Sequence, residues 1–403
     1  MSSSLPLKRD ALPFLPYGRQ TIDEGDIDAV CQVLRGDYLT TGPLIERFET
    51  ALAEAVCARD AVVCSSGTAA LYMTARALQL GPGTKAIVPS LTFLATASAP
   101  HLAGAEIVFA DVDPDCGLMR PGDLAHAFDR ARGAEALFNV HLNGQCGEVE
   151  EISAIARFNE AAVIDDGCHA LGTTVAGMRV GENAFSDMTV FSFHPVKTVT
   201  MGEGGAVTTN SEELARALRR ERNHGMTRAP GEFLNPDAFD ASGKANRWYY
   251  ELIEPGFNWR ATDIHCALGL SQLGKLDRFS AQRRALAAAY DALLAPYAPV
   301  IRPVAQQRGC TPTLHLYPVL IDFEGRGLPR GEVMARLAED GIGTQVHYYP
   351  VHRQRYFVER YGRLELPGAD RYYARVLSLP FFAGMTISDV ERVVDALART
   401  LAL

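Results

Sequence analysis

Residues 188–205 read MTVFSFHPVKTVTMGEGG and place a single lysine, Lys197, between two apolar segments. Residues 188–193 are apolar and aromatic and predict a buried strand, and residues 206–209 predict a second strand after a glycine-rich return. A lysine amine that such a turn shields from water loses its proton more readily and can then attack an aldehyde. A solvated lysine on a surface hairpin is the alternative interpretation of this stretch taken alone.

Short apolar strands alternate with helices on the N-terminal side of this stretch. Strands are predicted at 61–64, 86–89, 107–110, 136–142 and 161–164, with helices between them. This alternation is typical of an α/β fold with a mostly parallel sheet that is covered by helices on both faces. Asp23 is placed as the N-cap of an earlier helix over residues 24–35, and a broken helical pattern follows from residue 262 to residue 294.

The length of 403 residues predicts more than one domain. We expect an N-terminal arm over residues 1–20, a large domain over residues 21–265 and a smaller α+β C-terminal domain over residues 266–403. Within the last of these, residues 315–321 and 344–347 predict strands. Residues 226–250 are polar and loop-like, and a loop of this length is usually functional or disordered.

The composition argues against several classes of protein. Hydrophobic residues make up 47% and charged residues 22%, which is typical of a soluble globular protein. The net charge of −9 and the lack of a long Lys/Arg run predict no nucleic-acid partner. The ten histidines lack metal-ligand spacing and the eight cysteines form no CxxC pair, so we expect no metal site and no disulfide framework. No secretion signal and no long apolar stretch is visible, so we expect a cytoplasmic protein without a membrane span.

Two further segments carry groups that would suit a phosphorylated cofactor. Residues 65–68 (SSGT) lie between a strand and a helix, where free backbone N–H groups and a glycine can bind a phosphate. Asp165 and Asp166 end a strand, and a carboxylate at that edge of a doubly wound sheet can hold a proton on a ring nitrogen. An ordinary strand-to-helix turn and a helix N-cap are the alternative interpretations. Together with Lys197, the two segments suit pyridoxal 5′-phosphate, which carries a phosphate, a ring nitrogen and an aldehyde.

Six motifs make the chain resemble the DegT/StrS sugar-nucleotide aminotransferases, a group of the pyridoxal-phosphate-dependent transferases of fold type I. The motifs are TTGP at 40–43, SSGTAAL at 65–71, PSLTFLAT at 89–96, VIDDGCHALG at 163–172, FSFHPVKTVTMGEGG at 191–205 and GFNWRATDIHCALGLSQL at 256–273. The resemblance implies pyridoxal phosphate and pyridoxamine phosphate as the two forms of the cofactor. One departure is visible, because the family often has Glu-Asp-Ala-Ala where this chain has Asp-Asp-Gly-Cys at 165–168.

The resemblance implies roles at the cofactor ring for four residues, of which Lys197, Asp166 and His169 are catalytic and Phe93 binds the cofactor. Lys197 bonds covalently to the cofactor and later moves the proton between the substrate carbon and the cofactor. Asp166 pairs with the ring nitrogen, and His169 lies near the ring hydroxyl. Phe93 stacks on the face of the ring. A core position for Phe93 and a plain helix-face position for His169 are the alternatives.

The resemblance also implies a phosphate site and a second subunit. Gly67, Thr68 and Ser192 hold the phosphate of the cofactor. Asn258 and Arg260 reach in from the partner, Asn258 to the phosphate and Arg260 to an acidic group of a substrate. The expected assembly is therefore a homodimer with shared active sites.

Three segments narrow the resemblance to one branch of the family: YGRQTIDEGDIDAV at 17–30, DYLTTGP at 37–43 and NHGM at 223–226. This branch transfers the amino group of L-glutamate, which leaves as 2-oxoglutarate, to C4 of a UDP-linked 2-acetamido-2,6-dideoxy-4-keto-hexose, as in pseudaminic-acid synthesis. Tyr17, His347 and Tyr348 would then line the pocket for the UDP-4-keto sugar, although core packing also accounts for the aromatic pair.

Two other functions stay open at this point. A pyridoxamine-phosphate-dependent 4-keto-sugar 3-dehydratase belongs to the same group, but that branch has histidine at the lysine position, whereas this chain has Lys197 and places His194 three residues earlier. A catalytically silent regulatory protein on the same fold is the third candidate, because a fold does not guarantee a function.

Overall fold

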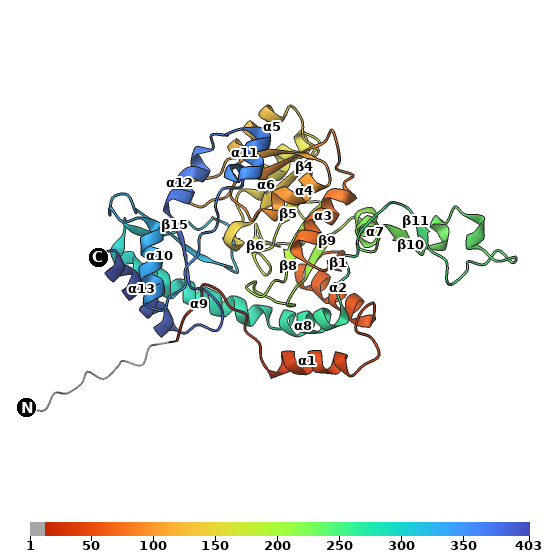
Figure 1. The fold of residues 1–403 in the computed structure, drawn as a ribbon, viewed down its shortest axis with the longest axis horizontal. Helices are drawn as coiled ribbons and strands as arrows, with labels where there is room; N and C mark the ends of the chain where they lie inside the picture. The colour runs from red at the N-terminus through yellow and green to blue at the C-terminus, as the bar shows by residue number, and fades with distance from the viewer. Residues whose placement is uncertain (1–12) are drawn as a thin grey trace, which may run out of the picture.

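The computed structural model describes residues 13–403, and a seven-stranded sheet forms its centre (Figure 1). The strand order is β1-β9-β8-β5-β4-β2-β3. The strands are β1 (Asp60–Cys64), β2 (Lys85–Pro89), β3 (Glu106–Ala110), β4 (Ala136–Val140), β5 (Ala162–Asp166), β8 (Met188–Ser192) and β9 (Gly205–Thr209). Only β9 runs antiparallel to its neighbours in this sheet, so the expectation of a mostly parallel sheet is confirmed.

Helices cover both faces of this sheet. Successive side chains of a strand point to opposite faces, and in β1 Val62 and Cys64 belong to one apolar core whereas Ala61 and Val63 belong to another. The helices of this part of the chain are α2 (Pro43–Val56), α3 (Gly67–Ala77), α4 (Ala95–Leu102), α5 (Pro121–Ala131), α6 (Val149–Phe158) and α7 (Glu212–Glu221). Because both faces are buried, the strands are mostly apolar rather than alternating, with polar residues chiefly at their ends, such as Asp165 and Asp166 of β5.

The N-terminal segment reaches across the molecule before the first helix. Of the predicted arm, residues 1–12 lie outside the described residues, and Leu15 exchanges backbone hydrogen bonds of 2.9 and 2.8 Å with Gly341 and Gly343. Helix α1 (Glu24–Leu34) begins at Asp23, whose carboxylate accepts a hydrogen bond from the N–H of Asp26, so the predicted N-cap is confirmed.

A broken pair of helices joins the large sheet to a second, smaller one. Helix α8 (Asp263–Leu273) packs on α1 and α2, and α9 (Leu276–Leu294) follows after a break at Gly274. The smaller sheet is antiparallel in the order β12-β14-β15, with bounds Ile301–Pro303, Tyr317–Ile321 and Val376–Leu379. The helices beyond α9 are α10 (Arg330–Glu339), α11 (Arg355–Tyr361), α12 (Pro367–Arg375) and α13 (Ile387–Thr400). The domain limit at residue 265 stays a prediction.

The predicted strand over residues 344–347 is wrong. Only Gln345 pairs, through two hydrogen bonds with Ser378 of β15, and the pairing stops there. The chain then turns away because the ring of His347 bonds to the hydroxyl of Ser378 at 2.8 Å and the hydroxyl of Tyr348 lies 3.3 Å from His169. Residues 345–348 therefore line a pocket instead of continuing a strand.

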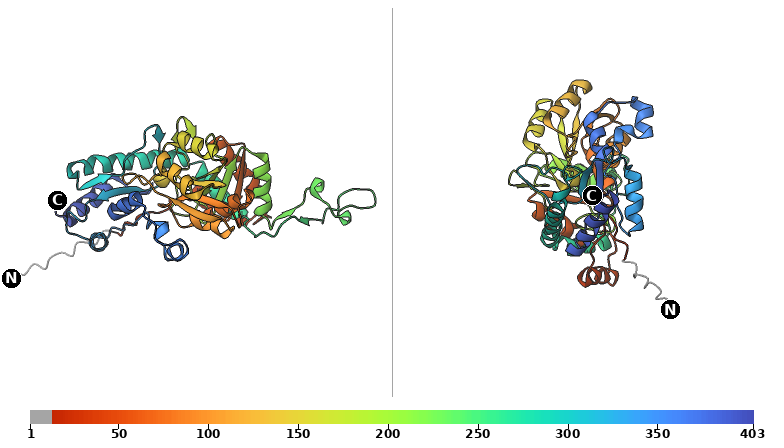
Figure 2. Two further views of the ribbon diagram at one scale, coloured as in Figure 1. Left: turned by 90° about the horizontal axis from the view of Figure 1, so that it is seen from above. Right: turned by 90° about the vertical axis from the view of Figure 1, so that its left-hand side faces the viewer.

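The polar segment predicted as a long loop forms an arm that projects from the large sheet (Figures 1 and 2). Two short strands, β10 (Met226–Thr227) and β11 (Glu251–Leu252), pair at its base. The remaining strands, β6 (Thr174–Val175), β7 (Met178–Arg179) and β13 (Cys310–Thr311), form a small separate sheet. Among residues 13–403, no helix is both long enough and apolar enough to cross a bilayer.

Candidate active site

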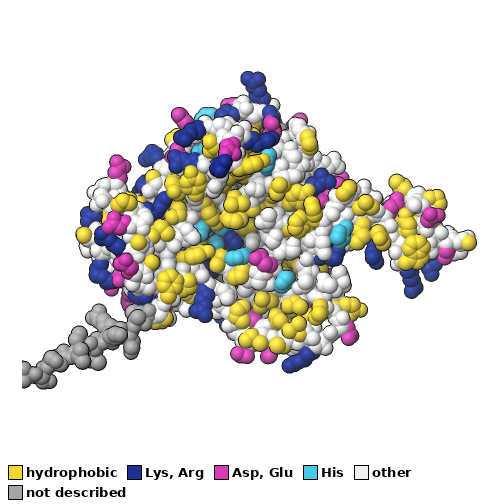
Figure 3. Space-filling model, viewed as in Figure 1, with side chains coloured by type: hydrophobic (Ala, Val, Ile, Leu, Met, Phe, Trp, Pro, Cys, Tyr) yellow, Lys and Arg dark blue, Asp and Glu magenta, His cyan; other side chains and the backbone are white. Residues whose placement is uncertain are grey.

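A cavity of about 670 Å³ opens beyond the carboxyl ends of β5 and β8, the edge at which doubly wound sheets bind ligands. Figure 3 looks onto this face, where the surface is hollowed near its middle and histidine side chains gather around the hollow. The cavity brings together most of the residues predicted from the sequence. They are Tyr17, Gly67, Thr68, Phe93, Asp166, His169, Ser192, Lys197, His347 and Tyr348.

The turn between β1 and α3 has the shape of a phosphate site. Ser66 caps α3, because its hydroxyl accepts a hydrogen bond of 3.1 Å from the N–H of Ala69. The first amides of a helix have no intrahelical acceptor, so those of Gly67 and Thr68 can donate to an anion. A Cβ on Gly67 would lie 2.8 Å from the Cβ of Ser192, so only glycine lets the turn approach the end of β8 this closely. The three predicted phosphate residues therefore lie together.

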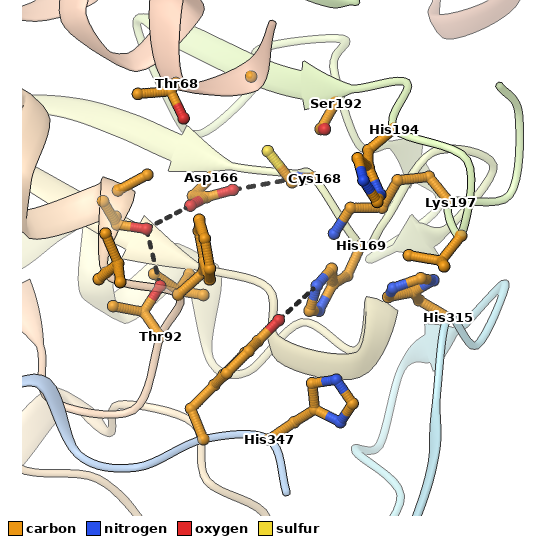
Figure 4. A pocket seen from close by; sticks show the side chains of 18 of the residues that line it. Thr68, Thr92, Asp166, Cys168, His169, Ser192, His194, Lys197, His315 and His347 are labelled. Carbon is orange, nitrogen blue, oxygen red and sulfur yellow. Dashed lines mark hydrogen bonds between the residues drawn. The ribbon is translucent and has the colours of Figure 1, made fainter. Parts of the chain in front are cut away.

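The carboxylate of Asp166 is held by two hydrogen bonds (Figure 4). Its Oδ2 accepts from the hydroxyl of Thr96 at 2.6 Å, and its Oδ1 accepts from the N–H of Cys168 at 3.2 Å. The hydroxyl of Thr92 lies 2.7 Å from that of Thr96. The side chains of Asp166, Thr92 and Thr96 are buried, whereas Cys168 is half-buried. Thr96 belongs to the motif at 89–96, but the sequence did not indicate that its hydroxyl would donate a hydrogen bond to Asp166.

Lys197 lies in the turn between β8 and β9 and faces Asp166 across the cavity (Figure 4). Its backbone N–H donates to His194 O at 2.9 Å, and the turn closes through Met201 N–H and Phe193 O at 2.9 Å. The side chain is partly buried, and burial lowers the pKa of the Lys197 amine, although Cys168 and Asp166 oppose this shift. The interpretation as a solvated surface lysine is therefore wrong, and the amine of Lys197 becomes neutral more readily than that of a solvated lysine.

Three buried histidines surround the lysine side of the cavity. Burial lowers the pKa of His347 to about 3 and lowers the pKa values of His169 and His315 well below the usual range, and the nearby Lys197 adds to each shift. The rings of His169 and His315 lie 4.3 Å apart between centroids. His315 begins the strand predicted over residues 315–321, and no local pattern marked it as a member of the site.

Aromatic residues line the cavity next to these histidines. Phe93 precedes α4 and is 53% exposed, so a core position for it is excluded. Its ring lies 6.2 Å from that of Tyr348, and the ring of Tyr17 lies 5.6 Å from that of His347. A flat cofactor ring or a substrate can enter between exposed and partly buried aromatic side chains of this kind.

Asn258 and Arg260 do not line this cavity. Asn258 is exposed, and Arg260 lines a separate pocket of about 950 Å³ beside the base of the arm, together with Arg219, Arg222 and Arg228. Within one subunit these two side chains therefore do not join the other predicted site residues.

A buried ion pair lies behind the site. His141 Nε2 and Asp165 Oδ1 are 3.3 Å apart, and Asn139 donates to the same oxygen at 3.1 Å. Burial alone would lower the pKa of His141, but the Asp165 carboxylate outweighs it and raises that pKa, while His141 in turn lowers the pKa of Asp165. The carboxylate of Asp165 is therefore paired with His141, and Asp166 is the carboxylate that faces the cavity.

The fold and the site define the class of this protein as a pyridoxal-phosphate-dependent transferase of fold type I. Residues 20–398 match the model of the DegT/DnrJ/EryC1/StrS aminotransferase family, and the chain belongs to this family. It is therefore a sugar aminotransferase whose cofactor alternates between pyridoxal phosphate and pyridoxamine phosphate.

Solved structures of other aminotransferases resemble the chain over nearly its whole length. PseC of Helicobacter pylori, an aminotransferase involved in the biosynthesis of pseudoaminic acid, is 28% identical, with a TM-score of 0.87 over 96% of this chain and 99% of that one. Spr1654 of Streptococcus pneumoniae, a putative sugar aminotransferase in its PMP form, is 26% identical, with a TM-score of 0.85 over 96% and 99%. DesI in the presence of its TDP-sugar product is 29% identical, with a TM-score of 0.83 over 96% and 93%.

The residues present fit the cofactor of this family. The turn at Gly67 approaches Ser192 so closely that a Cβ would clash there, and this brings the free amides of the turn beside the Ser192 hydroxyl. Asp166 is oriented by two hydrogen-bond donors and faces the same cavity as Lys197. Burial lowers the pKa of Lys197, so its amine loses a proton more readily. A phosphate, a protonated ring nitrogen and an aldehyde each have a matching partner.

Proposed function

We propose that this protein transfers the amino group of L-glutamate to C4 of a UDP-linked 2-acetamido-2,6-dideoxy-4-keto-hexose, in the synthesis of a pseudaminic-acid type of sugar. The observation that carries the amine transfer is the placement of Lys197, Asp166 and the Gly67 turn on one cavity. The choice of sugar is supported by the likeness to PseC and by the motifs that resemble this branch of the family.

Different residues of the chain bind the cofactor and move protons during amine transfer. When bound, the cofactor supplies an electron sink and a carbonyl group that accepts and releases the amine. Gly67, Thr68 and Ser192 bind its phosphate, and Asp166, oriented by Thr96, keeps a proton on its ring nitrogen. Lys197 as a neutral amine removes a proton from the α-carbon of glutamate and later delivers one to C4 of the sugar. Because Lys197 lies on one side of the cavity, it delivers this proton to one face of the sugar, which sets the stereochemistry.

A second copy of the chain completes the site in this proposal. A nucleoside diphosphate sugar brings at least two negative charges, yet the described lining of the cavity contains no arginine, one lysine and the two carboxylates of Asp166 and Glu203. Arg260 lines a different pocket, where three further arginines lie near it. The projecting arm exposes large apolar side chains, among them Leu234 (88%) and Trp248 (70%), which favours contact with a partner. We infer a homodimer in which Asn258 and Arg260 serve the cavity of the partner.

The substrate is tested with a panel of UDP- and dTDP-linked 4-keto sugars, each supplied with glutamate and read by the mass of the product. We expect the carbonyl oxygen of one UDP-linked 4-keto sugar to be replaced by an amino group, and Lys197→Ala to abolish this product. A product that has lost water would instead indicate a 3-dehydratase. No change with any sugar would indicate a silent protein, and a preference for dTDP sugars would refute the choice of nucleotide.

The shared site is tested by mixing two inactive variants, Lys197→Ala and Arg260→Ala, under conditions that exchange subunits. If the site is shared, each heterodimer regains one complete site, and an equal mixture recovers about one quarter of the wild-type activity. Native mass spectrometry of the mixture, with one variant carrying a tag of different mass, serves as the control for exchange. Full activity of Arg260→Ala alone, or no recovery after proven exchange, would contradict the shared site without affecting the proposed chemistry.

A further inference from the structure

Residues 141–146 (HLNGQC) form a tight turn against His169, and the sequence had given this turn no role. Asn143 adopts a left-handed backbone conformation with φ 63°, and its N–H donates a hydrogen bond of 3.2 Å to Nδ1 of His169. The next residue approaches even more closely, because a Cβ on Gly144 would lie 2.6 Å from the carbonyl oxygen of His169. The turn therefore holds both the backbone and the ring of His169.

The hydrogen bond from Asn143 decides which ring nitrogen of His169 carries the proton. A nitrogen that accepts a hydrogen bond cannot itself be protonated, so Nδ1 is the bare nitrogen. Burial keeps the ring neutral, because it lowers the pKa of His169 well below its usual range. The single proton of the neutral ring must then lie on Nε2, which points into the cavity (Figure 4).

The proton on Nε2 in turn sets the direction of the Tyr348 hydroxyl. Nε2 of His169 lies 3.3 Å from the hydroxyl oxygen of Tyr348, so the ring donates and the tyrosine oxygen accepts. The hydroxyl proton of Tyr348 is then free to be donated to another group. Tyr348 lines the cavity beside Phe93, so a molecule bound there can accept that proton.

Asn143 also holds the segment that carries His315, whose ring lies beside that of His169. Its carbonyl oxygen accepts from the N–H of His315 at 3.1 Å, and its Oδ1 accepts from the N–H of Leu316 at 2.8 Å. The side chain is buried at 4% exposure, and asparagine is one of the few residues other than glycine that adopts a left-handed conformation readily. One residue therefore connects the two segments that carry His169 and His315.

We propose that Asn143 is a positioning residue that fixes His169 as the Nε2–H tautomer and thereby presents the hydroxyl of Tyr348 as a hydrogen-bond donor to an oxygen of the bound substrate. The substrate oxygen belongs to a hydroxyl, keto or carboxylate group, all of which accept such a bond. The proposal depends on the contacts of Asn143, His169 and Tyr348 and is independent of which nucleotide sugar is the substrate.

The tautomer is tested directly by ¹⁵N NMR of the holoenzyme with labelled histidine, and His169→Gln identifies the signals of His169. We expect one nitrogen typical of an unprotonated acceptor, coupled through the bond to Asn143, and one protonated nitrogen, with no titration between about pH 6 and 8. A protonated Nδ1, a mixture of tautomers or an imidazolium in this range would overturn the proposal, whatever the activity of the enzyme.

Two variants of Asn143 separate the effect of its left-handed backbone conformation from the effect of its side-chain hydrogen bond. Asn143→Gly and Asn143→Val both lose the acceptor for Leu316, but glycine keeps the left-handed backbone at little cost, whereas a β-branched residue disfavours it. We expect the glycine variant to keep the Nε2–H tautomer and the valine variant to lose it. A wild-type tautomer in a folded valine variant would overturn the proposal. If the valine variant does not fold, the wild-type spectrum still decides the question.

The role of Tyr348 is tested by Tyr348→Phe, which removes only the hydroxyl. A neutral hydrogen bond to the substrate predicts that KM rises about fivefold to tenfold while kcat changes less. The His169 spectrum serves as the control, because the tautomer is set by Asn143 and must stay the same in this variant. An unchanged KM would refute the donation from Tyr348.

Discussion

Replacing Thr96 by valine removes one hydroxyl from the support of Asp166 and leaves the shape of the side chain nearly unchanged. The single hydroxyl proton of Thr96 is donated to Oδ2 of Asp166 at 2.6 Å, so the 2.7 Å contact with Thr92 must run from Thr92 to Thr96. Both threonines are buried, with exposures of 0% for Thr96 and 2% for Thr92. Water therefore cannot replace the lost hydroxyl without rearrangement.

The expected loss follows from the kind of hydrogen bond. A bond to an ionised group contributes about 1.5–3 kcal/mol, so the free energy of unfolding of the cofactor-free protein should fall by about this amount in Thr96→Val. Asp166 also becomes free to rotate away from the position in which it meets the ring nitrogen. We therefore expect the dissociation constant of pyridoxal phosphate to rise by up to about 100-fold, which corresponds to the upper part of this energy range.

The assay combines urea unfolding of the cofactor-free protein with a titration of cofactor followed by absorbance. Thr96→Ser is the matched control, because it keeps the hydroxyl and loses one methyl group, which costs about 0.8 kcal/mol. The valine variant should bind the cofactor much more weakly than the serine variant. Equal dissociation constants for the two variants would show that the Thr96 hydroxyl does not hold Asp166 in place.

Three further predictions concern the phosphate turn and the lysine. Ser66→Ala removes the N-cap of α3 and should lower the free energy of unfolding by about 1 kcal/mol; a change in cofactor affinity without this loss would contradict a capping role. Gly67→Ala places a Cβ 2.8 Å from that of Ser192 and should weaken cofactor binding at least about tenfold; binding like wild type in a titration would show that the turn is not the phosphate site. Burial lowers the pKa of Lys197, so below its unfolded pKa of about 10.4 the folded chain binds this proton less readily than the unfolded chain. Lys197→Met should therefore raise the melting temperature of the cofactor-free protein at pH 7, and a gain that did not shrink toward about pH 10 would contradict this explanation.

Local patterns in the sequence predicted the large sheet and its helices well. The strands of the sheet are short apolar runs bounded by glycine, proline or polar residues, and such runs are recognisable because both faces of the sheet are covered. The strand predicted at 344–347 failed for the opposite reason. There residues 345–348 all line the cavity, and a local pattern does not say which surface a side chain meets.

The residues of the candidate site also fall into two groups: those that local patterns predicted and those that only the structure identified. Lys197, Asp166 and Gly67 follow strands or open a helix, and chain order alone places such positions at one edge of a parallel sheet. Thr96, Asn143 and His315 reach the site through contacts that span tens to hundreds of residues, and nothing in their own neighbourhoods indicated these contacts.

The sequence by itself determined the class of fold, the order of the strands along the chain and the residue types able to hold a phosphate, a ring nitrogen and an aldehyde. These follow from local hydrophobic pattern and from residues whose chemistry does not depend on distant partners. Only the tertiary structure decided the direction of the pKa shifts of Lys197 and His169 and the orientation of Asp166 and Tyr348. Burial and hydrogen bonds determine those properties, and both arise when segments far apart in the chain pack together.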